Sequence, residues 1–478
     1  MPVRGDGILF RIGKDGGGLF ANGPPSAPMR PAVPARPARA GSWAATAAVF
    51  GTAAVIGCLS AQDPLAAAAL TGAASVAAVA LLAPFWAAAA ILASTAVSVQ
   101  IVFPETAVLG FELLALQKLA MLALMMPVML RYGIVRHRLL PVMALAASFA
   151  VTWLLGEPVL SVADSGKAFL GLAAPLAILA VRWPQRIAGR LIRMVMALPA
   201  ICLIAGIALQ AAGLHEVVMQ EFTGVPRLQG ASIPAHLAFL AFTGFAASVL
   251  EWKRKPPRQA PVFAMMGVNF LILLLTGTRG PLIASVPLVL VFLADLARQF
   301  ARGRSGLAVP LVGIAGLIGL SVLWQWDQLM KRSFFRSSSA GIDLSGREEA
   351  WRFFIERARE SPWFGKGLGS VLLANDGTLY EGFAVPHNEY IRFFYDAGIT
   401  GAALLFAALL AVLLAASRSA PSGGRAHWFA LVAGFLLYSA SDNTLSTLQF
   451  TVPFCALAGA YSIRPGSGRP GGKEAVHA

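Results

Sequence analysis

The 478-residue chain is 57% hydrophobic and 13% charged, with a mean hydropathy of +0.69, and these values exclude an ordinary soluble domain. The formal net charge of +15 does not by itself indicate a nucleic-acid partner, because cytoplasmic loops of membrane proteins accumulate Lys and Arg. The cysteines Cys58, Cys202 and Cys455 fall in or beside apolar segments, which indicates neither a disulfide framework nor a cysteine metal site. We therefore expect a polytopic membrane protein.

The chain divides into two tails, two groups of apolar segments and one long polar segment. Residues 1–42 are rich in Gly, Pro, Ala and Arg, and we expect a disordered cytoplasmic tail there. Apolar runs of membrane-crossing length follow over 43–324 and again over 399–463, before a cytoplasmic tail at 464–478. These runs should be helices, because a single span satisfies its own backbone polar groups only as a helix.

The expected spans number about 12 to 14. The apolar runs are 43–61, 65–83, 84–103, 106–130, 139–156, 168–182, 191–211, 233–250, 260–277, 281–297, 306–324, 399–417, 428–441 and 446–463.

The distribution of Lys and Arg predicts which side of the membrane each connection faces. Basic residues gather in the first tail and in alternate connections such as RYGIVRHR, RWPQRIAGRLIR and EWKRKPPR, which places these inside. The long segment 325–398 then falls outside, and its charges nearly balance. We expect one large extracytoplasmic loop containing short amphipathic helices.

The first helix of this loop is predicted from SGREEAW. Ser345 and Glu348 have the spacing of a capping box, and the helix should stop before Pro362. Trp351, Phe354, Ile355 and Ala358 follow a helical apolar pattern, so an amphipathic helix with solvated charges explains most of its residues. The next stretch, SPWFGKGLGS, lacks the P-loop pattern and is better interpreted as a structural turn.

His387, in PHNEY, is the candidate catalytic residue. It precedes a second short amphipathic helix, which Asn388 can cap and Gly398 can end in left-handed geometry. An imidazole, with an ordinary pKa of about 6.5, suits the removal of a proton from a sugar hydroxyl. Taken alone, His387 is more simply a hydrogen-bonded structural residue, and only the neighbouring motifs favour catalysis.

Two arginines lie at the outer membrane edge against the inside bias, Arg227 in PRLQG and Arg279 in GTRGP. A guanidinium keeps its charge and binds two phosphate oxygens at once, which suits a pyrophosphate leaving group. Snorkelling to lipid headgroups is the alternative for either arginine alone. His236 lies just inside a span, where helix packing is the simplest role and a site role the alternative.

Two further observations bear on the kind of site. Glu112 and Lys118 are six residues apart and do not share a helix face, so their roles stay open. The chain has no D-x-D, Walker or dinucleotide glycine motif. An acidic metal site for a nucleotide-sugar donor is therefore not predicted.

The loop motifs SGREEAW, SPWFGKGLGS and VPHNEYIRFFYDAGITG resemble those of the O-antigen ligase and polymerase superfamily of bacterial surface-polysaccharide enzymes. PRLQGASIPAHLAFL and GTRGPLIA are similar to two earlier motifs of the family, and the resemblance covers roughly residues 215–460. It implies an all-α, GT-C-like membrane fold. The chain departs from the family at Pro234-Ala235-His236, where many members have Pro-Asn, and in having fourteen apolar runs where twelve spans are usual.

The resemblance implies transfer of a glycan from an undecaprenyl-pyrophosphate carrier to an acceptor, with inversion and without a metal or cofactor. His387 would be the general base, Arg227 and Arg279 would bind the donor pyrophosphate, and Arg347, Asn388 and His236 would support them. The site would face the periplasm from the bacterial inner membrane, among membrane lipids and without a nucleic-acid partner.

The acceptor separates two expected functions. A ligase places the glycan on lipid A-core to make lipopolysaccharide, and we expect this one; a polymerase extends a growing O-antigen or exopolysaccharide. An alternative of another class is a transporter or flippase for lipid-linked glycans. That function predicts ionisable groups at mid-membrane depth, whereas this chain gathers its charges on one outer loop.

Overall fold

Apolar helices make up most of the computed structural model. It describes residues 78, 80–104, 106–108, 111–221, 224–254, 259–307, 311–316, 319, 320, 323, 326, 347–375, 385–420 and 423–463, which belong to one unit, Gly72–Ala478. The predictions for both tails, for the first expected span, for most of the second, and for 325, 327–346 and 376–384 of the long loop lie outside the described residues, as do Ser345 and Cys58.

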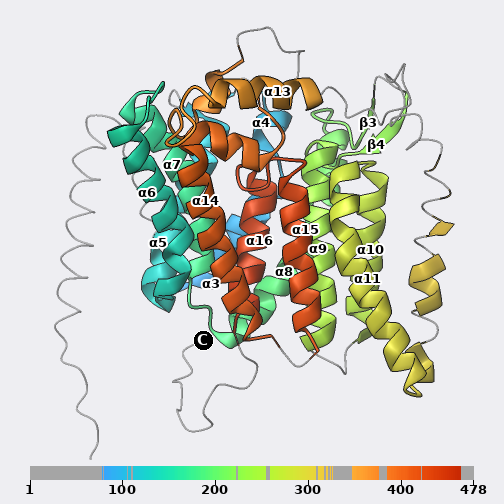
Figure 1. Cartoon of the computed structure of the whole chain (residues 1–478). Coiled ribbons are helices and arrows are strands. Elements are labelled where there is room, and N and C mark those ends of the chain that lie inside the picture. Colours follow the sequence, from blue (N-terminus) through green and yellow to red (C-terminus); the bar gives the residue numbers. More distant parts are fainter. Residues whose placement is uncertain are drawn as a thin grey trace, which may run out of the picture. The chain divides into compact units, whose positions relative to one another are not determined.

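Seven described helices are long and apolar enough to cross a membrane, and this confirms the all-α polytopic membrane fold (Figure 1). They are α5 (Leu113–Tyr132), α6 (Leu140–Leu155, with a leading 3-10 turn), α7 (Val162–Ala177), α8 (Gln185–Ala211), α9 (Pro234–Arg254), α11 (Arg279–Ala301) and α14 (Glu389–Ser417). Shorter helices lie between the seven long ones in the sequence, or precede or follow them: α3 (Pro84–Ser94), α10 (Gln259–Leu275), α15 (Arg425–Ser439) and α16 (Leu448–Tyr461).

Two small hairpins are the strand structure of the described residues. β1 (Ala107–Val108) pairs with β2 (Phe111–Glu112), and β3 (Val218–Gln220) pairs with β4 (Pro226–Leu228), both antiparallel. The second hairpin connects α8 to α9. It carries Arg227 and is therefore part of the site region.

Helix α9 is the most buried of the long helices, since 89% of its apolar window lies inside the protein. Phe239 of α9 stacks on Tyr438 of α15, with ring centroids 4.8 Å apart, and meets Phe450 of α16 edge-on at 5.5 Å. Aromatic contacts of this kind add to the packing energy of the buried surface. They fix the halves of α9, α15 and α16 that adjoin the candidate site against one another.

The prediction of one continuous span over 84–103 is wrong. Helix α3 ends at Ser94, and a separate one-turn helix α4 (Val99–Val102) follows. The backbone N–H of Ser98 donates to Ala231 O at 3.0 Å, a contact with a distant loop that replaces a helical bond. Because this contact is tertiary, hydrophobicity alone did not reveal the break.

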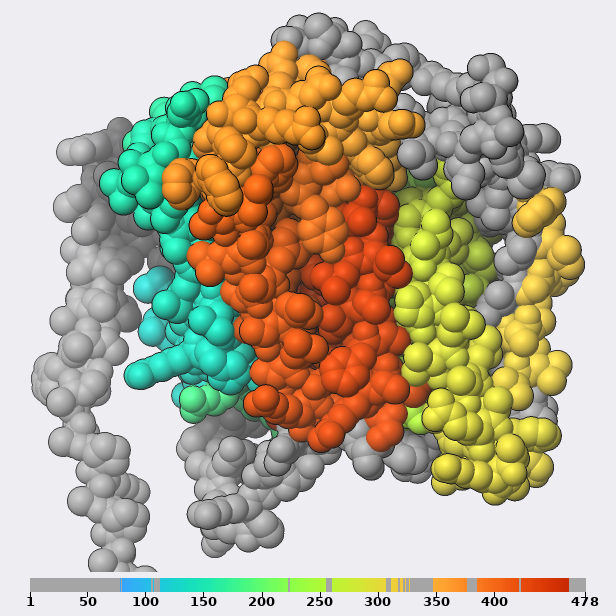
Figure 2. Space-filling model, in the orientation of Figure 1, coloured from blue at the N-terminus to red at the C-terminus, as the bar shows by residue number. Residues whose placement is uncertain are grey.

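Helix α13 (Arg347–Ala358), orange in Figure 2, lies across one end of the C-terminal helices. Its buried ridge is Ala350, Phe354 and Ala358, spaced four residues apart and packed with Tyr395 of α14. The predicted helix is thus present from Arg347 onward. Trp351 and Ile355, expected on the apolar face, flank this ridge and are half-buried.

The glycine turn after α13 is structural, as predicted. The buried carboxylate of Asp396 accepts hydrogen bonds from Gly369 N at 3.0 Å and Val371 N at 2.9 Å. Gly365 and Gly398 both have positive φ, 72° and 67°, and their backbones touch, because a Cβ on Gly365 would lie 2.5 Å from Ala397 N. Only glycines allow this approach, so the turn is locked onto α14.

Candidate active site

The segment before α14 has a constrained backbone. His387 has φ of 46°, and it is the one non-glycine with positive φ among the residues that the structure describes. Asn388 caps α14, accepting from Tyr390 N and Ile391 N at 3.0 and 3.2 Å. A left-handed conformation costs energy for a residue with a side chain, and such strain is often found at functional sites.

This segment is fixed from above by α13. The indole Nε1 of Trp351 donates to Pro386 O at 2.8 Å. Arg347, the first described residue of α13, donates from Nη1 to Ser441 O at 2.8 Å. Helix α13 therefore connects His387's neighbour to the loop between α15 and α16.

That loop, residues 440–447, is held by several side chains of the His387 region. Asn388 Nδ2 donates to Ala440 O at 2.9 Å. The fully buried carboxylate of Glu389 accepts from the backbone N–H groups of Leu445 and Ser446, at 2.6 and 2.8 Å. We call residues 440–447 the platform loop, because the candidate residues are arranged around it.

Asp442 of the platform loop contacts His387 directly. Its Oδ1 lies 3.2 Å from His387 Nδ1, and Asn443 Nδ2 lies 3.4 Å from the same nitrogen. The side chain of Asp442 is only 9% exposed, whereas 32% of the His387 side chain is exposed. A carboxylate partner favours the tautomer with the hydrogen on Nδ1, which places the imidazole lone pair on Nε2.

The environment keeps Asp442 ionised. Burial by itself raises the pKa of this carboxyl, but the hydrogen bond and charge of His387, the charge of Arg347 and the Asn443 N–H together lower the pKa below its ordinary value. A charged carboxylate on Nδ1 orients the imidazole and stabilises its protonated form. This is the arrangement that a general base needs.

Arg227 braces the turn that precedes α11. Its Nε donates to Thr276 O and its Nη2 to Thr278 Oγ1, both at 2.9 Å. Its Nη1 pairs with Glu221 at 3.3 Å. That the guanidinium binds pyrophosphate stays a prediction; the structure shows that it joins β4 to the turn carrying Arg279.

Arg279 is the first residue of α11 and is half-buried. The next residue, Gly280, packs against the platform loop, because a Cβ there would lie 2.9 Å from Ser441 Oγ. The first turn of α11 therefore touches the residue adjacent to Asp442. The arginine motif and the histidine motif, far apart in the sequence, meet at one loop.

His236 lies at the edge of the same cluster. Its Nδ1 is 2.8 Å from Ser98 Oγ, which also contacts Ser232 Oγ and accepts from Gln449 Nε2 at 3.0 Å. Its ring is close enough to Asp442 and His387 for their charges to interact. The break between α3 and α4 thus supplies the hydroxyl that orients His236.

Glu112 and Lys118 have a different location. Glu112 is an exposed N-cap residue of α5. Lys118 Nζ reaches Gly171 of α7, and its charge interacts with that of Arg392 of α14. The sequence left the roles of Glu112 and Lys118 open. The structure places the side chain of Lys118, which belongs to α5, near α7 and α14 and not on the platform loop.

Asp442 is the residue that sequence reasoning missed. It lies in SASDNTLST, a short polar connection between the last two expected spans. An acidic residue at the outer membrane edge was a usable signal, of the same kind as the outward arginines. Its partner could not be assigned from local spacing, because only the fold brings it to His387.

Within the described part of the chain, no three His, Cys, Asp or Glu side chains are grouped so as to hold a metal ion.

Comparison with known proteins supports the resemblance. Residues 262–406 match a family model described as O-antigen ligase, which confirms the resemblance to the O-antigen ligase and polymerase superfamily. The matched part contains Arg279, Arg347, His387 and Asn388, whereas Arg227, His236 and Asp442 lie outside it. No curated protein matches the chain.

Proposed function

We propose that this chain, whose segment 262–406 matches the O-antigen ligase family, transfers a glycan from an undecaprenyl-pyrophosphate carrier to lipid A-core at the periplasmic face of the inner membrane. The observation that carries the proposal is the contact of His387 with Asp442 of the platform loop, a loop that the first turn of α11, beginning at Arg279, also touches. A base and a permanent cation beside one loop fit a glycosyl transfer in which a pyrophosphate leaves.

In the proposed step, Nε2 of His387 removes the proton of an acceptor hydroxyl. The acceptor oxygen attacks the anomeric carbon, the bond from that carbon to the pyrophosphate oxygen breaks, and the electron pair leaves with the pyrophosphate. A single displacement of this kind inverts the anomeric configuration. Asp442 stabilises the imidazolium that forms, through the hydrogen on Nδ1.

Arg279 and Arg227 stabilise the negative charge that develops on the leaving pyrophosphate. Two guanidiniums at the membrane edge supply fixed positive charge in a region of low dielectric, where such charge is most effective. With these cations the proposed reaction proceeds without a metal or other cofactor. Arg227 does so while its donors also hold the Thr276 and Thr278 groups.

Arg347, Asn388 and His236 support this geometry. Arg347 and Asn388 hold the backbone of the platform loop at Ser441 and Ala440. His236, bonded to Ser98, borders the pair from below. Loss of any one of them should displace Asp442 from His387, so we propose positioning roles for all three.

The test uses purified His387→Ala and Arg279→Ala in proteoliposomes, supplied with lipid-linked oligosaccharide and candidate acceptors. We expect transfer to fall by roughly 10²- to 10⁴-fold for the loss of a general base. His137→Ala and Arg352→Ala are the matched controls, because both residues are exposed and away from the platform loop. Folded site variants that transfer glycan at the wild-type rate would refute the assignment.

A deletion strain separates ligase from polymerase. If the chain is a ligase, the deletion strain should still make glycan polymer on the carrier but lack the glycan on lipid A-core. If the chain is a polymerase, the deletion strain should lose the polymer. If it is a flippase, the deletion strain should accumulate single lipid-linked units on the cytoplasmic side. Separate analysis of lipopolysaccharide, exopolysaccharide and carrier-linked glycan distinguishes these outcomes.

A further inference from the structure

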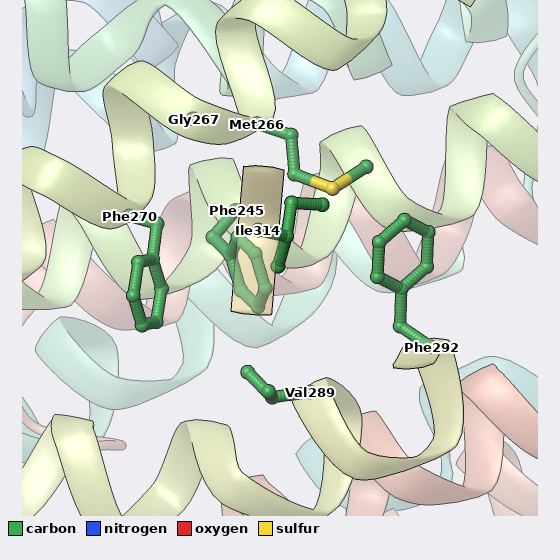
Figure 3. Close-up of a pocket in the computed structure, with 7 residues that line it drawn as sticks. All are labelled: Phe245, Met266, Gly267, Phe270, Val289, Phe292 and Ile314. Carbon is green, nitrogen blue, oxygen red and sulfur yellow. The ribbon is translucent and has the colours of Figure 1, made fainter. Parts of the chain in front are cut away.

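The apolar cavity between α9, α10 and α11 does not suit a substrate group (Figure 3). Its lining includes Phe245, Phe270 and Phe292, and its free space holds about one water molecule. Two cationic side chains that the proposed reaction does not use lie elsewhere, on α5 and α14. They are better placed to bind part of a substrate.

Lys118 and Arg392 are neighbouring cations from different helices. Lys118 is in the second turn of α5 and Arg392 in the first turn of α14, and they are close enough for their charges to repel each other. The Lys118 ammonium extends toward α7, where a Cβ on Gly171 would lie 3.3 Å from Nζ. The glycine thus leaves room for the ammonium beside α14.

Neither cation has a close anionic partner among the residues that the structure describes. Lys118 forms no hydrogen bond or ion pair with them, and Glu112 acts on it only from the exposed start of α5. Arg392 is 9% exposed, and its buried Nε donates no hydrogen bond and lies 3.9 Å from Asp396 Oδ2. Because burial of an uncompensated cation costs free energy, this arrangement points to an anion from outside the chain.

The carboxylates near Arg392 are directed toward the backbone. Asp396 accepts hydrogen bonds from the glycine turn, and Glu389 accepts them from the platform loop. Their charges act on Arg392. Lys118 is affected by Arg392 and Glu112 and not by these two carboxylates, so they do not compensate its charge.

The two cations lie across α14 from the arginines assigned to the donor. In Figure 1, α5 and α7 are at one edge of the helix array and α11 is at the opposite edge, with α14 between them. His387 directly precedes α14. Two lipid-linked substrates cannot occupy the same place in a bilayer, so they must reach His387 from different sides. Lys118 is roughly 8 Å from the start of α5, near the membrane surface where lipid phosphates lie.

We propose that Lys118 and Arg392 form a second anion site, which binds a phosphate group of the lipid A-core acceptor. The inference rests on the proposed function, because it takes the acceptor to be a phosphorylated lipid. A phosphate accepts charge-assisted hydrogen bonds from an ammonium and a guanidinium at once. Its charge compensates both cations and holds the acceptor on the side of His387 that faces away from the donor arginines.

The kinetic test measures the KM for the acceptor in proteoliposomes that contain the lipid-linked donor. Lys118→Gln should raise the KM for phosphorylated lipid A-core roughly tenfold, because one charge-assisted hydrogen bond is lost, and should leave the KM for the donor unchanged. Lys118→Arg keeps the charge and should recover most of the loss. With an acceptor that a phosphatase has dephosphorylated, Lys118→Gln and wild type should have the same KM.

Lys167→Gln is the matched control. It removes a lysine of α7 that is 77% exposed and pairs with Asp164 at the surface, so the KM for the acceptor should not change. If folded Lys118→Gln has the wild-type KM for the phosphorylated acceptor, or an equal rise in KM for both acceptors, the inference is wrong. A rise in the KM for the donor alone would assign the cations to the donor and overturn it as well.

A binding experiment separates the acceptor from ordinary membrane lipid without catalysis. Native mass spectrometry of the purified protein should show phosphorylated lipid A-core bound to wild type, and much less of it bound to Lys118→Gln. An equal concentration of phosphatidylglycerol should not displace it; displacement would identify a phospholipid headgroup site and overturn the inference. If wild type transfers glycan to no acceptor, the proposed function fails, and the binding experiment still decides what the cations hold.

Discussion

Asp442 contacts His387 through a carboxylate oxygen 3.2 Å from Nδ1, and its removal tests what this contact contributes. In Asp442→Asn the amide has a similar shape, but it no longer carries the charge that fixes the imidazole tautomer and stabilises imidazolium. We expect kcat to fall roughly tenfold or more, with a smaller change in the KM for the donor. Steady-state transfer in proteoliposomes measures both constants.

Asp442→Glu is the companion variant, since it keeps the charge and should recover part of the activity. A positioning role predicts that kcat, and not donor binding, distinguishes the two variants. Equal kcat values for Asp442→Asn and wild type would contradict the role of Asp442.

The lowered pKa of Asp442 also predicts a pH dependence of stability. A carboxyl whose pKa is lower in the folded than in the unfolded protein stabilises the fold above its unfolded pKa, about 3.9, and this stabilisation is lost as the pH falls through the folded value. The free energy of unfolding of wild type, relative to that of Asp442→Asn, should therefore be constant near neutrality and decrease below about pH 4. Thermal unfolding of both proteins in detergent, from pH 7 to pH 3, measures it.

The residues of the site differ in how far sequence alone could identify them. Asn388 was predicted as a helix cap from its position, and it does cap α14, because a capping bond depends only on residues three positions away. His387 and Arg279 were selected by family motifs. Asp442 was missed because its partner is distant in the sequence.

At the scale of elements, the contact between the glycine turn and α14 holds the outer loop on the membrane helices. Gly398 interrupts α14 with a positive φ of 67°, as expected, but its ψ of −177° differs from the left-handed helical geometry that was expected there. Ile399 N and Thr400 N beyond it donate to Pro362 O and Trp363 O of the turn, at 2.9 and 3.3 Å. The kink thus replaces helical bonds with bonds to the turn.

Gly398→Ala should destabilise this contact strongly. A Cβ there would lie 2.5 Å from Phe364 N, and the backbone conformation of Gly398, in a region that is essentially restricted to glycine, costs an alanine roughly 1–3 kcal/mol. We expect a lower thermal unfolding midpoint and faster proteolysis of the outer loop. Gly166→Ala in α7 is the control, since a Cβ at Gly166 meets nothing within 4 Å and should be tolerated. Equal midpoints for the two variants would contradict the locked turn.

The sequence predicted most helices to within a few residues but failed where tertiary contacts decide. The lengths of the apolar runs and the positions of prolines locate α8, α9 and α11, because each of these helices is marked by its own continuous run of apolar residues. The break after Ser94 and the two hairpins depend on contacts such as that of Ser98 with Ala231, which leave no periodic pattern.

At the scale of the whole molecule, composition was enough to predict an all-α membrane fold, because few other structures satisfy backbone polar groups in lipid. Composition was not enough to predict a site. The convergence of the Arg279 turn and His387 depends on the order in which the helices pack, and hydropathy carries no information on that order. The expectation came from the family motifs, and the contact of Gly280 with Ser441 is consistent with it.

The orientation of the protein in the membrane is the last prediction. Helices α5, α9, α11 and α14 end beside basic residues, and α8 and α15 begin beside them. Helix α13 and the platform loop lie at the opposite helix ends, as the alternation of the chain requires (Figure 1). From the inside bias of Lys and Arg we therefore predict that the candidate site faces the periplasm.

Single cysteines test this orientation in a background whose native cysteines are changed to serine. Arg352→Cys on α13 and Arg304→Cys after α11 both replace exposed residues, at opposite ends of the helices. A membrane-impermeant maleimide should label position 352 in spheroplasts, and position 304 only in inverted vesicles or after permeabilisation. The reverse pattern would place His387 in the cytoplasm, where an acceptor assembled on the outer side is out of reach, and the proposed transfer would be excluded.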